Sequence, residues 1–178
     1  MRNKKTLQLT TMAFIIAFAM ILSFVESRIP AFVAIPGVKV GLANIAVIFT
    51  LYKLGVKEAI TVSIIRVLMI AMLFGSAVSL IYSICGAILS LASMILLKKL
   101  TPLTEVAVSV TGGVMHNVGQ IAAASFMLST NVVIYYLPFL LVSGTIAGIV
   151  VGIASAILIK RVKFNYRQKR ETEEKRKR

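Results

Sequence analysis

Six long runs of apolar residues, separated by short polar or Gly/Pro-containing segments, dominate this chain of 178 residues. A helix needs roughly 20 apolar residues to cross the hydrocarbon core of a bilayer. The runs occupy residues 9–26, 38–53, 58–74, 77–97, 106–128 and 133–159, and the second and third are short and carry polar residues. Because 58% of the residues are hydrophobic and 15% are charged, the composition excludes a water-soluble globule. The sequence predicts an all-α, polytopic membrane bundle of six transmembrane helices.

Lysine and arginine gather in alternate connecting segments. Seventeen of the 20 basic residues lie before the first run, between runs two and three, between runs four and five, or from Lys160 onward; the others are Arg28, Lys39 and Arg66. Cytoplasmic segments of membrane proteins are enriched in Lys and Arg. We therefore expect both termini in the cytoplasm, with a cytoplasmic N-terminus (1–8), a transmembrane domain (9–160) and a basic cytoplasmic tail (161–178).

The net charge of +14 is thus located mainly at the chain ends and on one side of the bundle, which does not favour nucleic-acid binding. The tail has two interpretations: a solvated end, or a segment attracted to anionic lipid headgroups. The first run ends in Phe24-Val25-Glu26 without a small-residue cleavage site, so we expect an uncleaved first helix rather than a removed signal peptide.

The inventory of reactive side chains is small. All six acidic residues are glutamates, and the absence of aspartate excludes Asp-based metal or phosphoryl chemistry within the chain. Cys85 is the single cysteine and lies in an apolar run, where packing as a small hydrophobe is expected. The sequence therefore predicts no catalytic residue, no metal site and no resident cofactor.

Polar side chains inside a membrane are costly and call for a partner or a water-filled cavity. Five of the polar residues in the apolar runs are the main candidates: Asn44, Arg66, His116, Asn117 and Gln120. Counting 1.5 Å per residue, Arg66 lies about 12 Å into the third run from the cytoplasmic side. His116 and Asn117 reach a similar depth in the fifth run. Because their depths converge, we expect a polar cavity that opens to the outside and holds a ligand.

Charge indicates the nature of that ligand. In the half of the bundle expected to face the outside, Glu26 is the one acidic residue. The basic or protonatable residues there are Arg28, Lys39, Arg66 and His116. Such a cavity would favour a phosphate or carboxylate group with an apolar body. The alternative is structural: Arg66 would bind backbone carbonyls and fix packing, the amides would join helices, and Glu26 would pair with Arg28.

Pro and Gly make residues 27–37 an outer loop, which either covers the cavity or simply connects two helices. Small residues also recur at four-residue spacing, as Ala13 and Ala17 in the first run and as Gly144, Gly148 and Gly152 in the sixth. Such faces allow close helix packing, within the fold or against another protein, and spacing alone favours the internal role. Pro138 is expected to kink the sixth helix.

Three blocks carry a resemblance to a known family. They are Gly37-Val-Lys-Val-Gly-Leu-Ala-Asn44, Ile65-Arg66-Val67-Leu68 followed by Gly75-Ser76, and His116-Asn117-Val118-Gly119-Gln120. Together they resemble the Gx transporter family, also labelled heptaprenyl diphosphate synthase component I, over roughly residues 8–160. That family is similar to the substrate-binding S components of energy-coupling factor transporters.

The resemblance implies an S-component-like fold in the bacterial cytoplasmic membrane, where the chain works with a transmembrane scaffold subunit and two ATPase subunits that use ATP. It also implies that Ala13 and Ala17 dock onto the scaffold, which raises the partner-docking interpretation above the internal one for this pair. The residues carried over as the substrate site are Lys39, Asn44, Arg66, His116, Asn117 and Gln120. The ligand would be a small anionic or amphipathic molecule, such as an isoprenoid or quinone precursor.

Two other functions stay open. The chain would be a non-catalytic component I of heptaprenyl diphosphate synthase in isoprenoid or menaquinone biosynthesis, since prenyl synthases bind diphosphates through aspartate-rich motifs that it lacks. A structural membrane adaptor is the third possibility, and it would be indicated if Arg66 and His116 were sealed from water. Neighbouring genes for a scaffold and ATPases would favour transport, and prenyl synthase or quinone genes would favour the first alternative.

Overall fold

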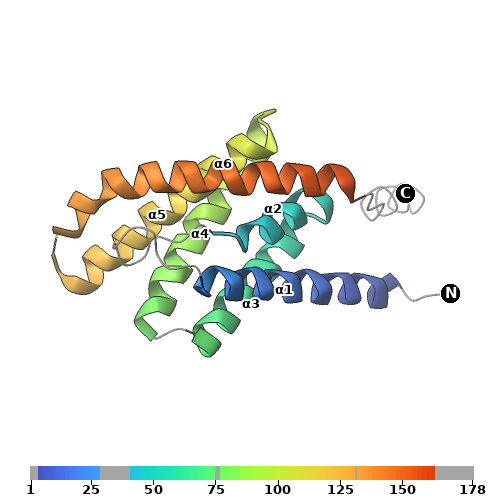
Figure 1. Ribbon diagram of the computed structural model, residues 1–178, viewed down its shortest axis with the longest axis horizontal. Coiled ribbons are helices and arrows are strands. Elements are labelled where there is room, and N and C mark those ends of the chain that lie inside the picture. The colour runs from blue at the N-terminus through green and yellow to red at the C-terminus, as the bar shows by residue number, and fades with distance from the viewer. Residues whose placement is uncertain (1–3, 29–40, 75–76, 131, 163–178) are drawn as a thin grey trace.

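The computed structural model describes residues 4–28, 41–74, 77–130 and 132–162, and this part of the chain is helical (Figure 1). The helices are α1 (Lys4–Arg28), α2 (Asn44–Lys53), α3 (Val56–Phe74), α4 (Ala77–Leu100), α5 (Glu105–Leu128), the short 3₁₀ helix η1 (Val132–Tyr136) and α6 (Leu137–Arg161). The predicted all-α class is confirmed, with six α-helices in the described part of the chain. The second helix is shorter than predicted because it begins at Asn44 rather than at residue 38.

Three helical segments are long and apolar enough to cross a membrane. They are Thr6–Glu26, Leu80–Leu100 and Val132–Arg161, as judged over the described residues. Their surfaces remain apolar: Phe14 on α1, Leu96 on α4 and Val142 on α6 are all more than half exposed. Exposure of so much apolar helix surface to water is unfavourable, whereas contact with lipid is not. The chain is therefore a membrane protein.

The two other long helices, α3 and α5, are not among these segments. α3 carries three charged residues, Lys57, Glu58 and Arg66, and α5 carries polar residues that include His116. At 1.5 Å per residue, the 10-residue α2 reaches about 15 Å, half the thickness of a bilayer core. Six complete crossings therefore remain a prediction. α1 begins and α6 ends at the same end of the molecule (Figure 1), as an even number of crossings would require.

The short helix α2 forms the centre of the hydrophobic core. Its residues from Ala46 to Leu51 are all buried, and it packs against α1, α3 and α6. A helix that is apolar on every side must be enclosed. The polar exception, Thr50, donates its hydroxyl hydrogen to the Ala46 carbonyl at 2.7 Å, so no hydrogen bond is lost on burial.

α5 packs closely against α4 on one side and α6 on the other. A Cβ added at Gly148 of α6 would lie 2.6 Å from the Val110 Cα of α5, and one added at Gly113 of α5 would lie 2.6 Å from the Gly144 carbonyl oxygen. Glycine is required here because the two backbones touch. The internal packing role expected of Gly144, Gly148 and Gly152 is confirmed.

Local sequence signals set the ends of these helices. The Thr104 hydroxyl oxygen accepts a hydrogen bond from the Ala107 backbone N–H at 3.3 Å and caps the start of α5. Ser129, with φ of 48°, ends the same helix in a left-handed conformation. Pro138 lies in the first turn of α6, where its missing N–H costs no hydrogen bond. The expected kink at Pro138 is therefore wrong, since the proline starts the helix instead of interrupting it.

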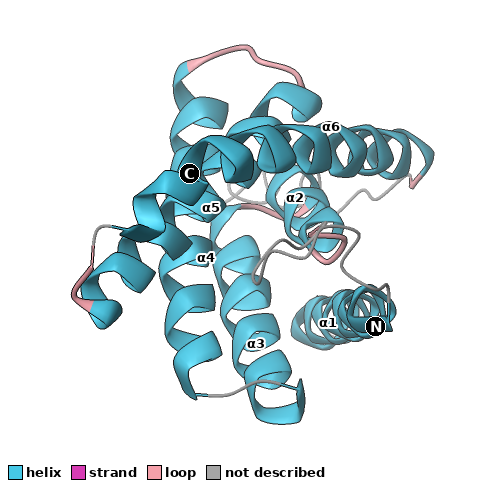
Figure 2. Ribbon diagram, turned by 60° about the vertical axis from the view of Figure 1, so that its left-hand side comes forward, coloured by secondary structure: helices cyan, strands magenta, loops and turns pink. Residues whose placement is uncertain are grey.

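The expected cytoplasmic end of the bundle is joined by polar contacts. Gln8 of α1 donates its side-chain amide to the Glu58 carboxylate of α3 at 3.1 Å. The Lys98 ammonium of α4 donates to the Leu51 carbonyl oxygen of α2 and lies 4.4 Å from the centroid of the Tyr52 ring. These polar contacts join α1 to α3 and α4 to α2. α3 and α4 also lie side by side as a hairpin (Figure 2).

Candidate functional site

Arg66 lies on the buried face of α3. Val62, one turn earlier, is fully buried, while Ile64 and Leu68 on the other side of the helix are exposed. Periodicity therefore directs the arginine inward. The side chain is only 8% exposed, and its Nε atom has no hydrogen-bond partner among the described residues. A guanidinium offers five N–H donors, and burying them without acceptors is unfavourable.

Glu26, near the end of α1, binds the backbone just before α2. One carboxylate oxygen accepts a hydrogen bond from the Gly41 N–H at 2.6 Å, and the other accepts one from the Leu42 N–H at 3.1 Å. Gly41 has φ of 74°, a left-handed conformation that glycine adopts without strain. The turn directs both N–H groups at one carboxylate, so Glu26 fastens α1 to the start of α2.

Arg66 and Glu26 lie on helices that pack against each other, α3 and α1. The carboxylate oxygens of Glu26 form hydrogen bonds with the Gly41 and Leu42 backbone N–H groups. A charged group inside a membrane protein requires compensation by an opposite charge or by a ligand. The buried face of α3 therefore holds a cation whose Nε donor has no partner among the described residues. Chemically, it is suited to binding a small anion.

The polar residues of α5 lie on two faces. His116 packs on α4, where a Cβ added to Gly86 would lie 2.9 Å from the imidazole Cε1. Asn117 turns to α6, and its buried amide donates to the Leu140 carbonyl oxygen at 2.6 Å. Gln120 is half-buried one turn beyond His116. Asn117 thus joins two helices directly.

The structure brings some of the predicted site residues together and not others. Asn44 is the first residue of α2 and donates its backbone N–H to the Gly41 carbonyl oxygen at 2.8 Å, beside the segment that Glu26 binds. Arg66 lies on α3, which packs on α1 and α2. α5, with the other three residues, packs chiefly on α4 and α6.

Other residues singled out in the sequence either are not described or lie on the outer surface of α1. Lys39 and most of the loop 27–37 fall outside the described residues, as does the side chain of Arg28. Ala13 and Ala17 are both exposed on α1, next to the exposed Phe14. Their small-residue face is therefore not buried by the parts of the chain that the structure describes.

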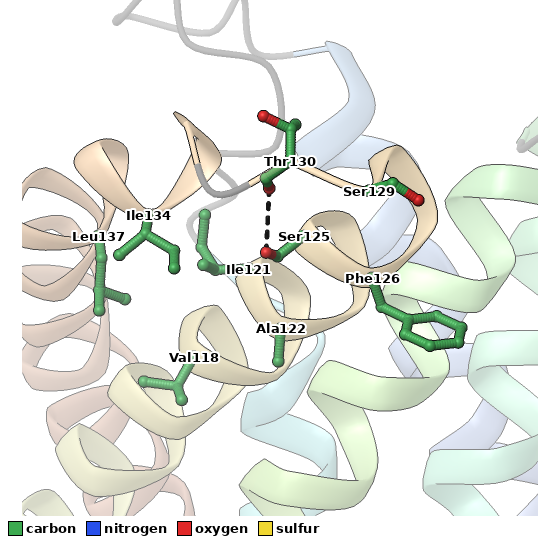
Figure 3. Close-up of a pocket in the computed structure, with 9 residues that line it drawn as sticks. All are labelled: Val118, Ile121, Ala122, Ser125, Phe126, Ser129, Thr130, Ile134 and Leu137. Atoms are coloured by element: carbon green, nitrogen blue, oxygen red, sulfur yellow. Dashed lines mark hydrogen bonds between the residues drawn. The ribbon is translucent and has the colours of Figure 1, made fainter.

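An open pocket lies between the second half of α5 and the start of α6 (Figure 3). Its volume is about 670 Å³, and its lining is Val118, Ile121, Ala122, Ser125, Phe126, Ser129, Thr130, Ile134 and Leu137. The Ser125 hydroxyl donates to the Thr130 carbonyl oxygen at 3.0 Å, as the dashed line in Figure 3 marks. Among the described residues, no charged side chain and none of the predicted site residues lines this pocket, so the described lining offers an anion no counter-charge.

Sequence reasoning missed the hydrogen bonds from Gly41 and Leu42 to Glu26. The signal was present in part, since Glu26 is the sole acidic residue of the outer half and a glycine precedes the second helix. Two buried hydroxyls, Ser90 and Ser109, were also missed, and neither has a hydrogen-bond partner within the described residues. Among the described side chains, no three His, Cys, Asp or Glu residues are grouped as metal ligands.

The fold and this site define an all-α membrane protein with a buried arginine on α3 and a carboxylate on α1 that binds the backbone before α2. The family model described as heptaprenyl diphosphate synthase component I matches residues 15–158, and the chain belongs to this family. No curated protein and no solved structure matches the chain.

Proposed function

We propose that the chain is the substrate-binding membrane subunit of an energy-coupling factor type transporter, and that it takes up a small anionic or amphipathic molecule such as an isoprenoid or quinone precursor. The observation that carries the proposal is Arg66, which is buried in an inward face of a membrane protein with an Nε donor that no described residue accepts. Ionisable residues in such positions mark binding sites or transport pathways. The family membership is compatible with this role.

An arginine that served packing alone would be expected to bind helix ends or carbonyl oxygens. Here the Nε donor of Arg66 has no described partner, and the carboxylate of Glu26 on α1 accepts from two backbone N–H groups. The planar guanidinium therefore keeps donors for the paired oxygens of a carboxylate or phosphate, which it binds well. Asn44, at the start of α2, is the described polar side chain best placed to contribute, and Lys39, His116 and Gln120 stay candidates.

Energy for transport has to come from partner subunits. The chain lacks the GxxxxGK[ST] loop that cradles nucleotide phosphates, so ATP would be used by ATPase subunits attached through a transmembrane scaffold. α1 offers a docking face, because Ala13 and Ala17 are exposed at four-residue spacing. Small residues let two helices approach closely within a membrane.

A second function is favoured by the family description itself, which names a component of heptaprenyl diphosphate synthase. The chain would then be a non-catalytic membrane partner of a prenyl synthase. Lack of aspartate argues against catalysis by this chain, because prenyl synthases bind magnesium diphosphates through aspartate-rich motifs.

Purification from native membranes in a mild detergent separates the two functions. We expect a scaffold and ATPase subunits to co-purify with the tagged chain, and we expect the double change Ala13→Leu and Ala17→Leu to abolish this association. Ala92→Leu, at an exposed alanine of α4, is the matched control and should retain the partners. Co-purification of a prenyl synthase without ATPase subunits would refute the transporter and establish the second function.

A further inference from the structure

α5 and α6 diverge toward the end of the molecule where η1 joins them. At Gly113 and Gly144 the two backbones touch, since a Cβ added at Gly113 would lie 2.6 Å from the Gly144 carbonyl oxygen. One turn further along α5, the Asn117 amide still reaches the Leu140 carbonyl oxygen at 2.6 Å. Beyond this hydrogen bond begins the pocket of Figure 3, which Leu137 lines from α6. The space between the helices is therefore a groove, the α5–α6 groove, that narrows toward Asn117 and opens beside η1.

Hydrogen bonds brace the open end of the α5–α6 groove. The Thr130 N–H donates to the Ser125 carbonyl oxygen at 3.3 Å, and the Ser125 hydroxyl donates to the Thr130 carbonyl oxygen at 3.0 Å. The Val132 N–H donates to the Thr130 hydroxyl oxygen at 3.3 Å. These bonds fix the turn from α5 to η1, so the groove is formed before any ligand enters it. A preformed site loses less entropy on binding than a site that a ligand must order.

The α5–α6 groove lies at one end of a membrane-spanning segment. The apolar span Val132–Arg161 begins at its open end, where Tyr135 is 84% exposed and Tyr136 is half exposed. Tyrosine is enriched where a bilayer meets water. On α5 the lining extends from Val118 to Phe126, about 12 Å at 1.5 Å per residue, which is close to the roughly 15 Å of hydrocarbon in one leaflet. The groove thus has the length of one lipid chain, with its open end at the level of the head groups.

The lining becomes more polar toward the open end. Val118 and Ala122 lie on the part of α5 nearer Asn117, whereas the hydroxyl groups of Ser129 and Thr130 belong to the turn after the helix. A hydroxyl donates and accepts hydrogen bonds, so it pairs well with an alcohol or an ester. An ionised head group would lose its hydration here without gaining a counter-charge from the described lining. The volume of about 670 Å³ lies within the range of about 300–1,000 Å³ that is typical of small-molecule sites.

We propose that the α5–α6 groove is a binding site for one uncharged, single-chain amphiphile of the membrane, a long-chain alcohol or its ester. The hydrocarbon chain lies along α5 with its end toward Asn117, and the polar end lies at Ser129 and Thr130. Length, polarity and the lack of charge in the described lining all favour this occupant. The inference does not depend on the proposed function, because none of the residues predicted for the substrate site lines this groove.

Quenching of an introduced tryptophan tests the site. The chain has no tryptophan of its own, so Ile134→Trp places a single reporter in the lining, at a side chain that is 47% exposed. The full chain is placed in lipid nanodiscs, one copy in each, and titrated with dodecanol brominated in the middle of its chain. We expect saturable quenching of the tryptophan fluorescence. Adding Ala122→Phe, which fills the groove from an exposed position, should abolish it, and adding Ala92→Phe, at an exposed alanine of α4, should leave it unchanged.

A second probe tests the preference for an uncharged head group. The equally brominated dodecanoate, ionised at pH 9, should bind more weakly than the alcohol by more than about tenfold, because the groove supplies no counter-charge from its described lining. Equal affinity of the two probes would overturn this preference and the proposal with it.

Three further results would overturn the proposal. Quenching that does not saturate, and that equals the quenching of a Leu96→Trp reporter on the exposed face of α4, would mean that the groove holds only bulk lipid. Saturable quenching that persists in the Ala122→Phe protein would place the probe elsewhere. Quenching that is lost when two copies share a nanodisc would mean that a second copy of the chain covers the groove.

Discussion

At the scale of single residues, Arg66 is the side chain for which a binding role and a structural role predict the most different effects of substitution on stability. A buried guanidinium with an unmet donor is a stability cost, and replacing buried charges by apolar groups of similar size is often neutral or stabilising, by about 1–4 kcal/mol. We expect Arg66→Met to unfold at the same temperature as the parent or higher. Thermal unfolding in detergent, followed by intrinsic tyrosine fluorescence, measures this.

The same variant decides between the two interpretations of the residue. A loss of unfolding free energy above about 2 kcal/mol in Arg66→Met would mean that the arginine holds the fold together. Ile64→Met, on the exposed face of α3, is a control for the substitution itself and should leave stability unchanged.

Asn117 is a residue for which we expect the opposite result. Its amide donates to the Leu140 carbonyl oxygen at 2.6 Å in a buried place between α5 and α6. We expect Asn117→Ala to lower the free energy of unfolding by about 1 kcal/mol, as a lost hydrogen bond between membrane helices does, and to retain anion binding. Unchanged stability together with lost binding would instead return Asn117 to the substrate site.

The two α5 residues show what could be predicted from the sequence and what could not. Helical spacing places Gly112 and His116 on one face of α5 and Gly113 and Asn117 on a neighbouring face. The structure turns the first face to α4 and the second to α6. The depth of a residue along a helix follows from counting residues. The helix toward which its side chain points depends on which helices are neighbours, and residue spacing does not reveal the neighbours. Convergence in depth therefore did not establish that these side chains share a cavity with Arg66.

At the scale of elements, the crossing of α5 and α6 depends on glycine. A Cβ at position 148 would lie 2.6 Å from the Val110 Cα, a backbone atom that cannot rotate away. We expect Gly148→Ala to destabilise the protein by about 1–3 kcal/mol, the usual cost of overpacking. Val150→Leu, at a position 51% exposed on the same helix, should change stability by less than about 0.5 kcal/mol. Equal stability of both variants would show that the helices can separate without cost.

Helix positions were predictable because apolar runs and the breaks between them depend only on residues that are neighbours in the sequence. The break at Gly75-Ser76 correctly separated α3 (Val56–Phe74) from α4 (Ala77–Leu100). The start of α2 was less predictable, since it depends on the turn at Gly41 and on a distant carboxylate, Glu26. A contact between residues so far apart in the sequence produces no periodic pattern from which it could be predicted.

At the scale of the whole molecule, the two chain ends should lie on one side of the membrane. A cysteine introduced at Thr6 or Arg161, in a Cys85→Ser background, is expected to react with a membrane-impermeant maleimide from the cytoplasmic side. A cysteine at the exposed Ser129, which follows α5, should react from the outside. Labelling of positions 6 and 129 from the same side would contradict the six-crossing arrangement and with it the orientation of the Arg66 site.

Native mass spectrometry of the chain in mild detergent, beside Arg66→Gln, tests the central claim most directly. The account predicts a small anion bound to the parent, lost from Arg66→Gln and retained by Arg161→Gln, whose side chain is exposed at the end of α6. The mass of that anion would identify the ligand. Equal occupancy in all three proteins, or a prenyl synthase chain bound in place of a small molecule, would contradict a substrate-binding role.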